Sequence, residues 1–247
     1  MYYCIHPMQQ EGIQINKYIS SSGYCSRREA DKLVEAGRVM INDKVAKLTH
    51  KVHENDSVAV DFEYIKKKKV QAVYIALNKP VGVTSTTDTK DKSNIISFLN
   101  YPKRIFPIGR LDKDSEGLIL LTNDGDIVNK ILRAGNNHEK EYVVTVNKAI
   151  TPDFIYQMSN GVNILETTTL KCKVKQESGK KFRIVLKQGL NRQIRRMCET
   201  LGYEVISLTR VRIMHIELAK LQAGKWRYLS PLEIADLENL LKDSSKT

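Results

Sequence analysis

Four consecutive lysines, Lys66–Lys69, interrupt the chain about a quarter of the way along its length. Adjacent lysine side chains repel one another and bury no apolar surface, so we expect this stretch to be exposed and mobile. The sequence therefore predicts two folded units, a small one over residues 13–61 and a larger one over residues 71–241, joined by a lysine-rich linker over residues 62–70. A chain of 247 residues has room for one small and one large domain.

The small unit has the pattern of two helices followed by short strands. Ile15–Ser20 predicts the first helix. Ser26 and Glu29 form a capping box, in which each side chain accepts a hydrogen bond from the other residue's backbone N–H. The apolar spacing that follows predicts an amphipathic helix over Arg27–Ala36, closed by Gly37. Short strands are expected at Val39–Ile41, around Val45 and at Ser57–Val60.

Basic side chains gather on the second predicted helix and just beyond it, and they comprise Arg27, Arg28, Lys32, Arg38 and Lys44. In the whole chain 40 Lys and Arg residues outnumber 28 Asp and Glu residues, which gives a net charge of +12. Such an excess is typical of proteins that bind polyanions, although a surplus spread over the surface gives the same total. Charge therefore indicates the sign of the partner and says nothing about chemistry.

The larger unit mixes helices and hairpins irregularly, which favours the α+β class around a largely antiparallel sheet. Alternation over Thr168–Gln176 predicts a strand whose Leu170, Cys172 and Val174 face inward, paired with Phe182–Leu186 in a hairpin. The other expected strands are Val73–Leu77, Glu141–Val146 and parts of Tyr203–Leu218. The expected helices are Ser93–Leu99, Asp126–Arg133, one opened by Thr151-Pro152 and ended by Gly161, Arg192–Leu201, and one opened by a second capping box at Ser230–Glu233.

A polar loop over Gly109–Leu118 holds three carboxylates and two cations between two glycines, immediately before the apolar run Leu118–Leu121. A polar loop that enters a buried strand is a usual position for catalytic groups, because the strand holds the loop rigidly. A solvated, charged turn has the same pattern. From the residues alone, Asp112, Asp114 and Glu116 are equivalent as candidates for chemistry.

The cysteines predict free thiols in a reducing compartment. They form no C-x-x-C pair and have no histidine at ligand spacing, so we expect no metal site; they are Cys4, Cys25, Cys172 and Cys198. Met1–Gly12 lacks the apolar segment of a signal peptide, and no apolar run approaches the ~20 residues that a membrane span needs. We therefore expect a cytoplasmic protein with no membrane contact.

The loop at Gly109–Leu118, continued through Gly125, resembles the signature of the RsuA-type pseudouridine synthases. Lys140–Val144, Gln188–Met197 and the turn Lys79–Gly82 resemble the same family. The small unit resembles the RNA-binding domain named after ribosomal small-subunit protein four. The resemblance covers about residues 13–241. It implies an α+β chain in which a small α/β RNA-binding domain precedes a mixed, largely antiparallel-sheet synthase catalytic domain.

By its position in the family pattern, Asp112 is the nucleophile, and Arg192 is the basic residue beside it. Tyr142 stacks on the uracil and is placed to take part in proton transfer, and the sequence leaves open whether it does both. The resemblance also implies RNA contacts by Arg110, Leu111, Lys113, Gln193, Ile194 and Arg195, and by the basic residues Arg27, Arg28, Lys32, Arg38 and Lys44 of the small unit.

The implied chemistry explains these residue types. Pseudouridine formation breaks the N1–C1′ bond, turns the uracil ring and rejoins it through C5. Because nothing is oxidised, no cofactor is expected. A carboxylate serves at such an oxocarbenium-like centre. A paired arginine counters the desolvation that raises the carboxyl pKa in a dry pocket, and it can hold the carboxylate bidentately. A uridine in folded RNA is stacked or paired, so it must be flipped out.

Leu190, together with Asn136–Tyr142, indicates the large-subunit branch of the family, and hence a uridine of 23S ribosomal RNA as substrate. A synthase whose main target is another RNA, such as transfer RNA, is an alternative. The identity of the uridine is open, and a monomer is expected. Two rivals are a non-catalytic RNA-binding or ribosome-assembly factor and another RNA-modifying enzyme, such as a methyltransferase. The sequence has no G-x-G, so it lacks the glycine-rich nucleotide-binding turn typical of the second rival.

Overall fold

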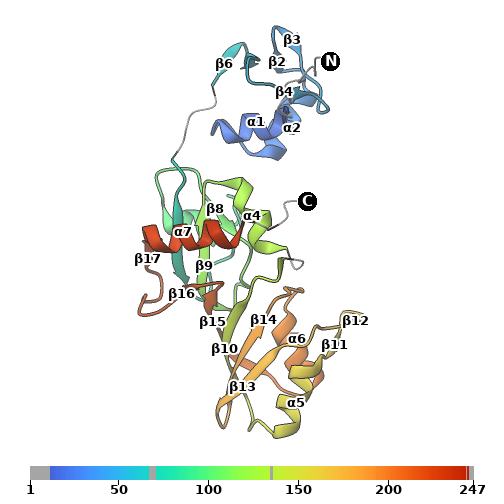
Figure 1. Cartoon of the computed structure of the whole chain (residues 1–247), viewed down its shortest axis with the longest axis vertical. Helices are drawn as coiled ribbons and strands as arrows, with labels where there is room; N and C mark the ends of the chain where they lie inside the picture. Colours follow the sequence, from blue (N-terminus) through green and yellow to red (C-terminus); the bar gives the residue numbers. More distant parts are fainter. Residues whose placement is uncertain (1–11, 67–70, 134–135, 243, 245–247) are drawn as a thin grey trace, which may run out of the picture. The chain divides into compact units, whose positions relative to one another are not determined.

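The chain folds into two units, Met1–Gln71 and Ala72–Thr247, in a computed structural model that describes residues 12–66, 71–133, 136–242 and 244 (Figure 1). Lys67–Lys69, on which the expected mobile linker depends, lie outside these residues, as does Cys4. The class predicted from the sequence is confirmed, with a small mixed unit ahead of a larger one built on a largely antiparallel sheet.

The first unit has two helices against a four-stranded antiparallel sheet of order β3-β2-β5-β6, with a separate β1–β4 pair. The capping box at Ser26 and Glu29 is present, and Ala30 and Val34 of α2 are buried. The elements are β1 (Ile13–Gln14), α1 (Ile15–Ser21), α2 (Arg27–Glu35), β2 (Val39–Ile41), β3 (Lys44–Val45), β4 (Lys51–Val52), β5 (Val58–Val60) and β6 (Glu63–Ile65).

Strand β6 corrects the predicted start of the linker. Residues 63–65 pair antiparallel with β5, and the Tyr64 hydroxyl donates a hydrogen bond of 2.9 Å to Asp43. No sequence pattern indicated this strand, because Glu63 and Tyr64 are exposed and carry no apolar alternation. The lysines follow the strand directly.

The second unit is built on a nine-stranded sheet. Seven of its strands follow the order β13-β14-β10-β15-β9-β7-β17, and the other two, β8 and β16, pair with β9 and β15 respectively. All its pairs are antiparallel except β15 with β9, which are parallel. The strands are β7 (Tyr74–Lys79), β8 (Phe106–Ile108), β9 (Glu116–Thr122), β10 (Lys140–Val146), β13 (Lys173–Ser178), β14 (Lys181–Leu186), β15 (Val205–Ile213), β16 (Ile216–Glu217) and β17 (Trp226–Tyr228), with a separate pair β11 (Asn163–Ile164) and β12 (Thr167–Thr168).

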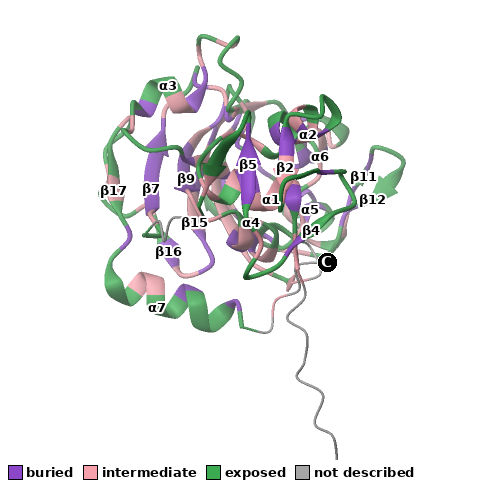
Figure 2. Ribbon diagram, turned by 90° about the horizontal axis from the view of Figure 1, so that it is seen from above, coloured by how far each residue is buried: buried purple, intermediate pink, exposed green. Residues whose placement is uncertain are grey.

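Helices cover both faces of the sheet centre, where β7 and β9 are buried throughout most of their length (Figure 2). Successive side chains of a strand point to opposite faces. Ile75 and Leu77 therefore join the larger apolar core, whereas Tyr74 and Ala76 join a second one. The helices are α3 (Ile95–Leu99), α4 (Gly125–Leu132), α5 (Pro152–Asn160), α6 (Gln193–Thr200) and α7 (Pro231–Leu240).

Two local predictions in this unit are wrong. The strand expected over Thr168–Gln176 begins only at Lys173, because the backbone N–H of Leu170 donates to the Gln188 side chain instead of to a neighbouring strand. Leu170, expected to face inward, is 55% exposed. Arg192, expected to be the first helical residue, is the N-cap of α6 in a left-handed conformation with φ 49°. The inward positions of Cys172 and Val174 are confirmed, since both pack on the larger core.

Gly117 marks the point where β9 meets β15, and it has no room for a side chain. An added Cβ would lie 2.3 Å from the Arg210 carbonyl oxygen, and its φ of +106° is a conformation that L residues rarely adopt. We expect Gly117→Ala to destabilise the second unit by about 2–4 kcal/mol. The single tryptophan, Trp226 in β17, reports on this unit by its fluorescence during urea unfolding.

Gly179→Ala is the matched control, because an added Cβ there meets nothing within 4 Å. It is expected to leave the unfolding midpoint almost unchanged. Equal midpoints for the two variants would contradict the steric reading of the β9–β15 contact.

Candidate active site

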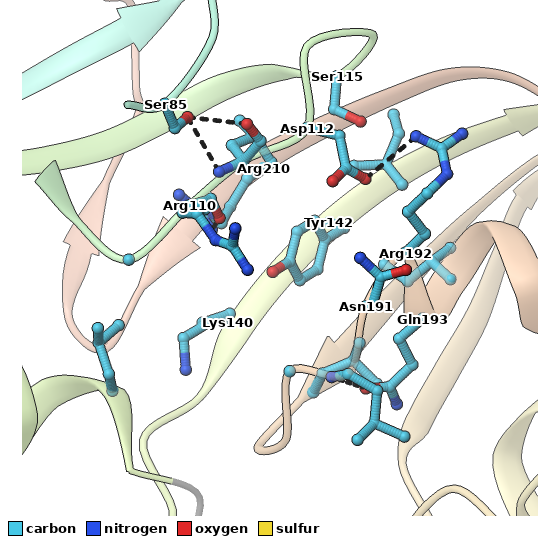
Figure 3. Close-up of a pocket in the computed structure, with 18 of the residues that line it drawn as sticks. Ser85, Arg110, Asp112, Ser115, Lys140, Tyr142, Asn191, Arg192, Gln193 and Arg210 are labelled. Atoms are coloured by element: carbon cyan, nitrogen blue, oxygen red, sulfur yellow. Dashed lines mark hydrogen bonds and ion pairs between the residues drawn. The ribbon is translucent and has the colours of Figure 1, made fainter. Parts of the chain in front are cut away.

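A cavity of about 710 Å³ opens in the second unit where β10, β15 and β9 lie side by side. The parallel register sets Arg210 of β15 opposite Gly117 of β9, and the antiparallel register sets Arg210 opposite Tyr142 of β10. The loop that precedes β9 therefore reaches the same place as Tyr142 (Figure 3). Asp112 is the one carboxylate among the described residues that line this cavity.

The loop from Arg110 to Asp114 is fixed through its backbone. Every carbonyl oxygen in it accepts a hydrogen bond, from groups that come from four separate parts of the chain. The donors, in loop order, are Arg210 Nη1, Ser85 Oγ, the Ser115 N–H, the Gly82 N–H and Arg195 Nη2, at 3.3, 2.8, 3.1, 2.8 and 2.9 Å. A loop held at each peptide keeps its side chains in position without help from the substrate.

Arg192 lies against both acidic side chains of the loop, but it holds them differently from the arrangement expected. Its two terminal nitrogens donate to the two oxygens of Asp114, at 3.1 and 2.9 Å. Its nearest approach to Asp112 is an ion-pair distance of 3.7 Å, from Nη1 to Oδ2. The bidentate hold expected for Asp112 is therefore corrected: the fork is on Asp114, and Asp112 keeps its oxygens open to the cavity.

Asp114 is an anchor for two arginines. Hydrogen bonds from Arg192 hold the pKa of its carboxyl below its usual range, and the charge of Arg195 acts in the same direction against the effect of burial. Arg195 Nε lies 3.4 Å from Asp114 Oδ2. Arg192 lies immediately before α6, and its side chain binds Asp114 of the loop. The start of the helix and the loop are therefore tied together at this point.

Tyr142 enters the cavity from the face of β10 that it shares with Val144, which is buried in the larger core. In Figure 3 its ring points into the space between Asp112, Arg110 and Lys140. Its partner in β15, Arg210, is 3% exposed and donates from Nε to the Leu118 carbonyl at 2.7 Å. The Nη2 atom of Arg210 is buried with no hydrogen-bond partner among the described residues.

A second buried cation lies behind the loop. Lys79 is fully buried at the end of β7, and its Nζ donates to the Pro80 and Val83 carbonyls, both at 2.9 Å. Burial, and next the charge of Arg210, lower the pKa of Lys79 to about 8, while the carboxylates led by Asp112 oppose the shift. The Lys79–Gly82 turn noticed in the sequence is thus part of the scaffold of the loop.

The remaining predicted contacts in this unit divide by burial. Arg110 and Lys113 are exposed at the rim of the cavity. Leu111, Gln193 and Ile194 are at most 7% exposed and line the cavity wall. A contact by these three is therefore restricted to a nucleotide that has entered the cavity.

In the first unit Arg27, Arg28, Lys32 and Lys44 are exposed, as expected for a basic surface. Arg38 is exposed as well, but it is already paired. Its Nε and Nη2 donate to the two oxygens of Asp61 at 2.6 and 2.5 Å. Arg38 is therefore a weaker candidate for phosphate than the other four.

Sequence reasoning missed three residues of the site: Ser85, Lys140 and Arg210. Lys140 and Arg210 were visible as cations at alternate positions of apolar strands, next to Tyr142 and Val211. Ser85 carried no signal, because it contacts the loop only through the fold. No group of three potential metal ligands occurs among the residues that the structure describes, and none of the described helices is long and apolar enough to cross a membrane.

Comparison with known proteins agrees with this geometry. Residues 73–200 match the RNA pseudouridylate synthase family, and residues 15–58 match the S4 domain. A solved structure titled "Crystal structure of pseudouridylate synthase" superposes with a TM-score of 0.67 at 25% identity, over 92% of this chain and 99% of that one. The chain belongs to the RNA pseudouridine synthase family and is an isomerase that converts uridine to pseudouridine in RNA.

Individual relatives refine the class. The chain is 56% identical to the dual-specificity RNA pseudouridine synthase RluF of Escherichia coli K12, over 96% of this chain and 82% of that protein. It is 36% identical to the ribosomal large subunit pseudouridine synthase B of Bacillus subtilis, over 92% of this chain and 96% of that protein. The large-subunit branch of the family, expected from Leu190 and Asn136–Tyr142, is confirmed by the likeness to these two relatives.

Proposed function

We propose that this protein converts a uridine of 23S ribosomal RNA to pseudouridine, with Asp112 as the nucleophile. The single observation that carries the proposal is the position of Asp112. It is the carboxylate that faces the cavity, 3.7 Å from the guanidinium of Arg192 and opposite the ring of Tyr142 (Figure 3). Asp114 is occupied by two arginines, and Glu116 accepts a hydrogen bond of 2.9 Å from Thr209.

The proposed reaction begins with a uridine flipped out of the RNA into the cavity, where its ring stacks on Tyr142. A carboxylate oxygen of Asp112 attacks the nucleotide as the N1–C1′ bond breaks. The uracil turns, C5 bonds to C1′, and Asp112 is released as the carboxylate. C5 loses a proton and N1 gains one, so reactant and product are isomers. Arg192, fixed by Asp114, keeps Asp112 oriented.

The substrate class is supported by the names of the relatives, one of which acts on the large ribosomal subunit. The name of another, a dual-specificity enzyme, supports a second RNA substrate, and transfer RNA is our candidate. We further propose that the protein works in the cytoplasm as a monomer. It requires no cofactor under this scheme, because the reaction has no redox step.

The direct test maps pseudouridine in ribosomal and transfer RNA from cells that lack the gene, and repeats the mapping after the purified protein has acted on the same RNA. Loss of one 23S site in the cells and its return in vitro is the expected result. If the 23S RNA were unchanged and a transfer-RNA site were lost, transfer RNA would take the place of 23S RNA as the main substrate. No change in either RNA would mean that the target uridine lies in another RNA.

The exposed basic residues of α2 are proposed to deliver the enzyme to structured RNA. Arg27, Arg28 and Lys32 form no ion pair with any residue that the structure describes, so their charges are free to meet phosphates. Each phosphate contact changes the slope of log affinity against log salt by about 0.7–0.9. A variant with all three changed to Gln is therefore expected to bind ribosomal RNA with a slope that is shallower by about 2–3.

Binding is measured on the full chain at several salt concentrations, with conversion rates at saturating RNA beside it. The rate at saturation should stay close to that of the wild type, because the cavity belongs to the second unit. Arg38→Gln is the control, and it should change the slope less, since Asp61 already pairs with Arg38. A triple variant with the wild-type slope would show that this face of α2 does not touch RNA.

A further inference from the structure

Lys140 is the first residue of β10, and its side chain enters the cavity from the same face of the strand as Tyr142 (Figure 3). In the neighbouring strand β14, Leu186 lies opposite Lys140 and Ile184 lies opposite Tyr142, and both are buried in the larger core. Residues two apart on one face of a strand are separated by about 6.6 Å. The ammonium of Lys140 is thus within reach of the edge of a base that stacks on Tyr142.

The surroundings of Lys140 do not satisfy its charge. No carboxylate of the described residues lies within ion-pair distance, and the hydrogen bond from Nζ to the His138 carbonyl is long, at 3.4 Å. Burial, together with the charge of Arg210, lowers the pKa of Lys140 to about 8. A partly buried cation without a partner costs free energy in the unliganded protein, and such groups in a cavity mark functional sites.

The other cations around the cavity are already engaged or lie at its rim. Arg192 and Arg195 are bonded to Asp114. Arg210 is bonded to backbone carbonyls through Nε and Nη1, and its Nη2, unpaired among the described residues, is buried out of reach of solvent. Arg110 and Lys113 are exposed. Among the described cavity residues, Lys140 is therefore the cation that is both inside and available.

We infer that Lys140 stabilises the negative charge on the uracil ring while the ring is detached from the sugar. This inference rests on the reaction proposed above. Before the reaction, the negative charge is on Asp112, beside Arg192. When the carboxylate oxygen bonds to C1′ and the N1–C1′ bond breaks, the electron pair of the broken bond stays on the uracil, so the charge moves toward Lys140.

Lys140 then donates a hydrogen bond to a carbonyl oxygen of the ring and keeps its own proton throughout. When C5 bonds to C1′, the C1′–oxygen bond breaks and the charge returns to Asp112. The loss of one proton from C5 and the gain of one at N1 leave a neutral product. Two cations thus hold one negative charge in turn, Arg192 at the carboxylate and Lys140 at the ring.

The test compares Lys140→Met and Lys140→Arg in the full chain, by single-turnover conversion of 23S ribosomal RNA at saturating protein. Lys140→Met removes the charge at nearly constant volume, and its rate is expected to fall about 100-fold or more with RNA affinity nearly unchanged. Lys140→Arg keeps the charge and should retain most of the rate. Lys187→Met, at an exposed lysine outside the cavity, is the control and should convert like the wild type.

The pH profile gives a readout that a packing role would not move. A Lys that must be protonated loses its effect as the pH rises through its pKa, so the wild-type rate should decline above about pH 8. The decline should shift upward in Lys140→Arg. The other charged or titratable groups around Lys140 are Arg210, Arg110, His138 and Tyr142. The arginines stay charged, burial lowers the pKa of His138, and Tyr142 is unchanged in the variant.

A wild-type rate for Lys140→Met would overturn the inference, as would a loss that lies entirely in RNA affinity, which is the signature of a phosphate contact. An alkaline decline that stays in place in Lys140→Arg would overturn it as well. Failure of the proposed function looks different, because the wild-type protein would then convert no uridine in 23S RNA. If Lys140→Met does not fold, Lys140→Arg and its pH profile still decide the matter.

Discussion

Asp112→Asn is expected to lower the rate of pseudouridine formation by about 10⁴-fold or more, because loss of an essential nucleophile removes the covalent route. The side chain is 37% exposed, and its one close charged contact is the 3.7 Å approach of Arg192. Asn has nearly the same shape, so folding and RNA binding should stay close to those of the wild type. Single-turnover conversion and RNA binding, measured on the same preparation, check both halves of this expectation.

Glu116→Gln is the matched control for Asp112→Asn. Glu116 accepts a hydrogen bond from Thr209, and an amide oxygen can accept the same bond. This variant should retain much of the rate although it removes a carboxylate only four residues away. Normal turnover by Asp112→Asn, or an equal loss in the two variants, would remove Asp112 from the role of nucleophile.

The elements whose signals are local in the chain were predictable. The capping boxes at Ser26 and Ser230 fix the starts of α2 and α7 through hydrogen bonds that span three residues. The apolar runs of β7 and β9 predict strands that are buried on both faces. Periodicity and capping depend on near neighbours, and the sequence displays them directly.

The arrangement inside the site was not predictable in the same way. Asp112 and Asp114 are two residues apart and chemically alike, and only the fold decides which of them receives the fork of Arg192. Ser85 holds the loop from 26 residues away, through bonds to the backbone of Leu111. Nearly every residue offers the same backbone donor and acceptor, so no sequence pattern indicates which backbone group a distant side chain will bind.

If Arg192 held Asp112 directly, Asp114→Asn would be nearly silent. Because Asp114 binds Arg192 and also contacts Arg195, we expect Asp114→Asn to reduce the rate, though far less than Asp112→Asn. Asn can accept from one nitrogen of the fork but cannot balance its charge.

Arg192→Lys is expected to lower the rate at saturating RNA by about 100-fold, although it keeps the positive charge. A guanidinium binds the two oxygens of Asp114 and still directs Nη1 toward Asp112, whereas an ammonium has no planar fork with which to do both. RNA affinity should change little. Conversion rates and binding curves for the same RNA separate a loss of orientation from a loss of phosphate contact.

Arg196→Lys is the control on the same helix, because Arg196 bonds to Asn191 and to no carboxylate among the described residues. It should convert RNA at nearly the wild-type rate. Combining Arg192→Lys with Asp114→Asn should cost less than the sum of the two single effects, since both break one contact. Near-normal turnover by Arg192→Lys would mean that Arg192 only positions RNA, and strictly additive losses would mean that Asp114 acts on Asp112 by another route.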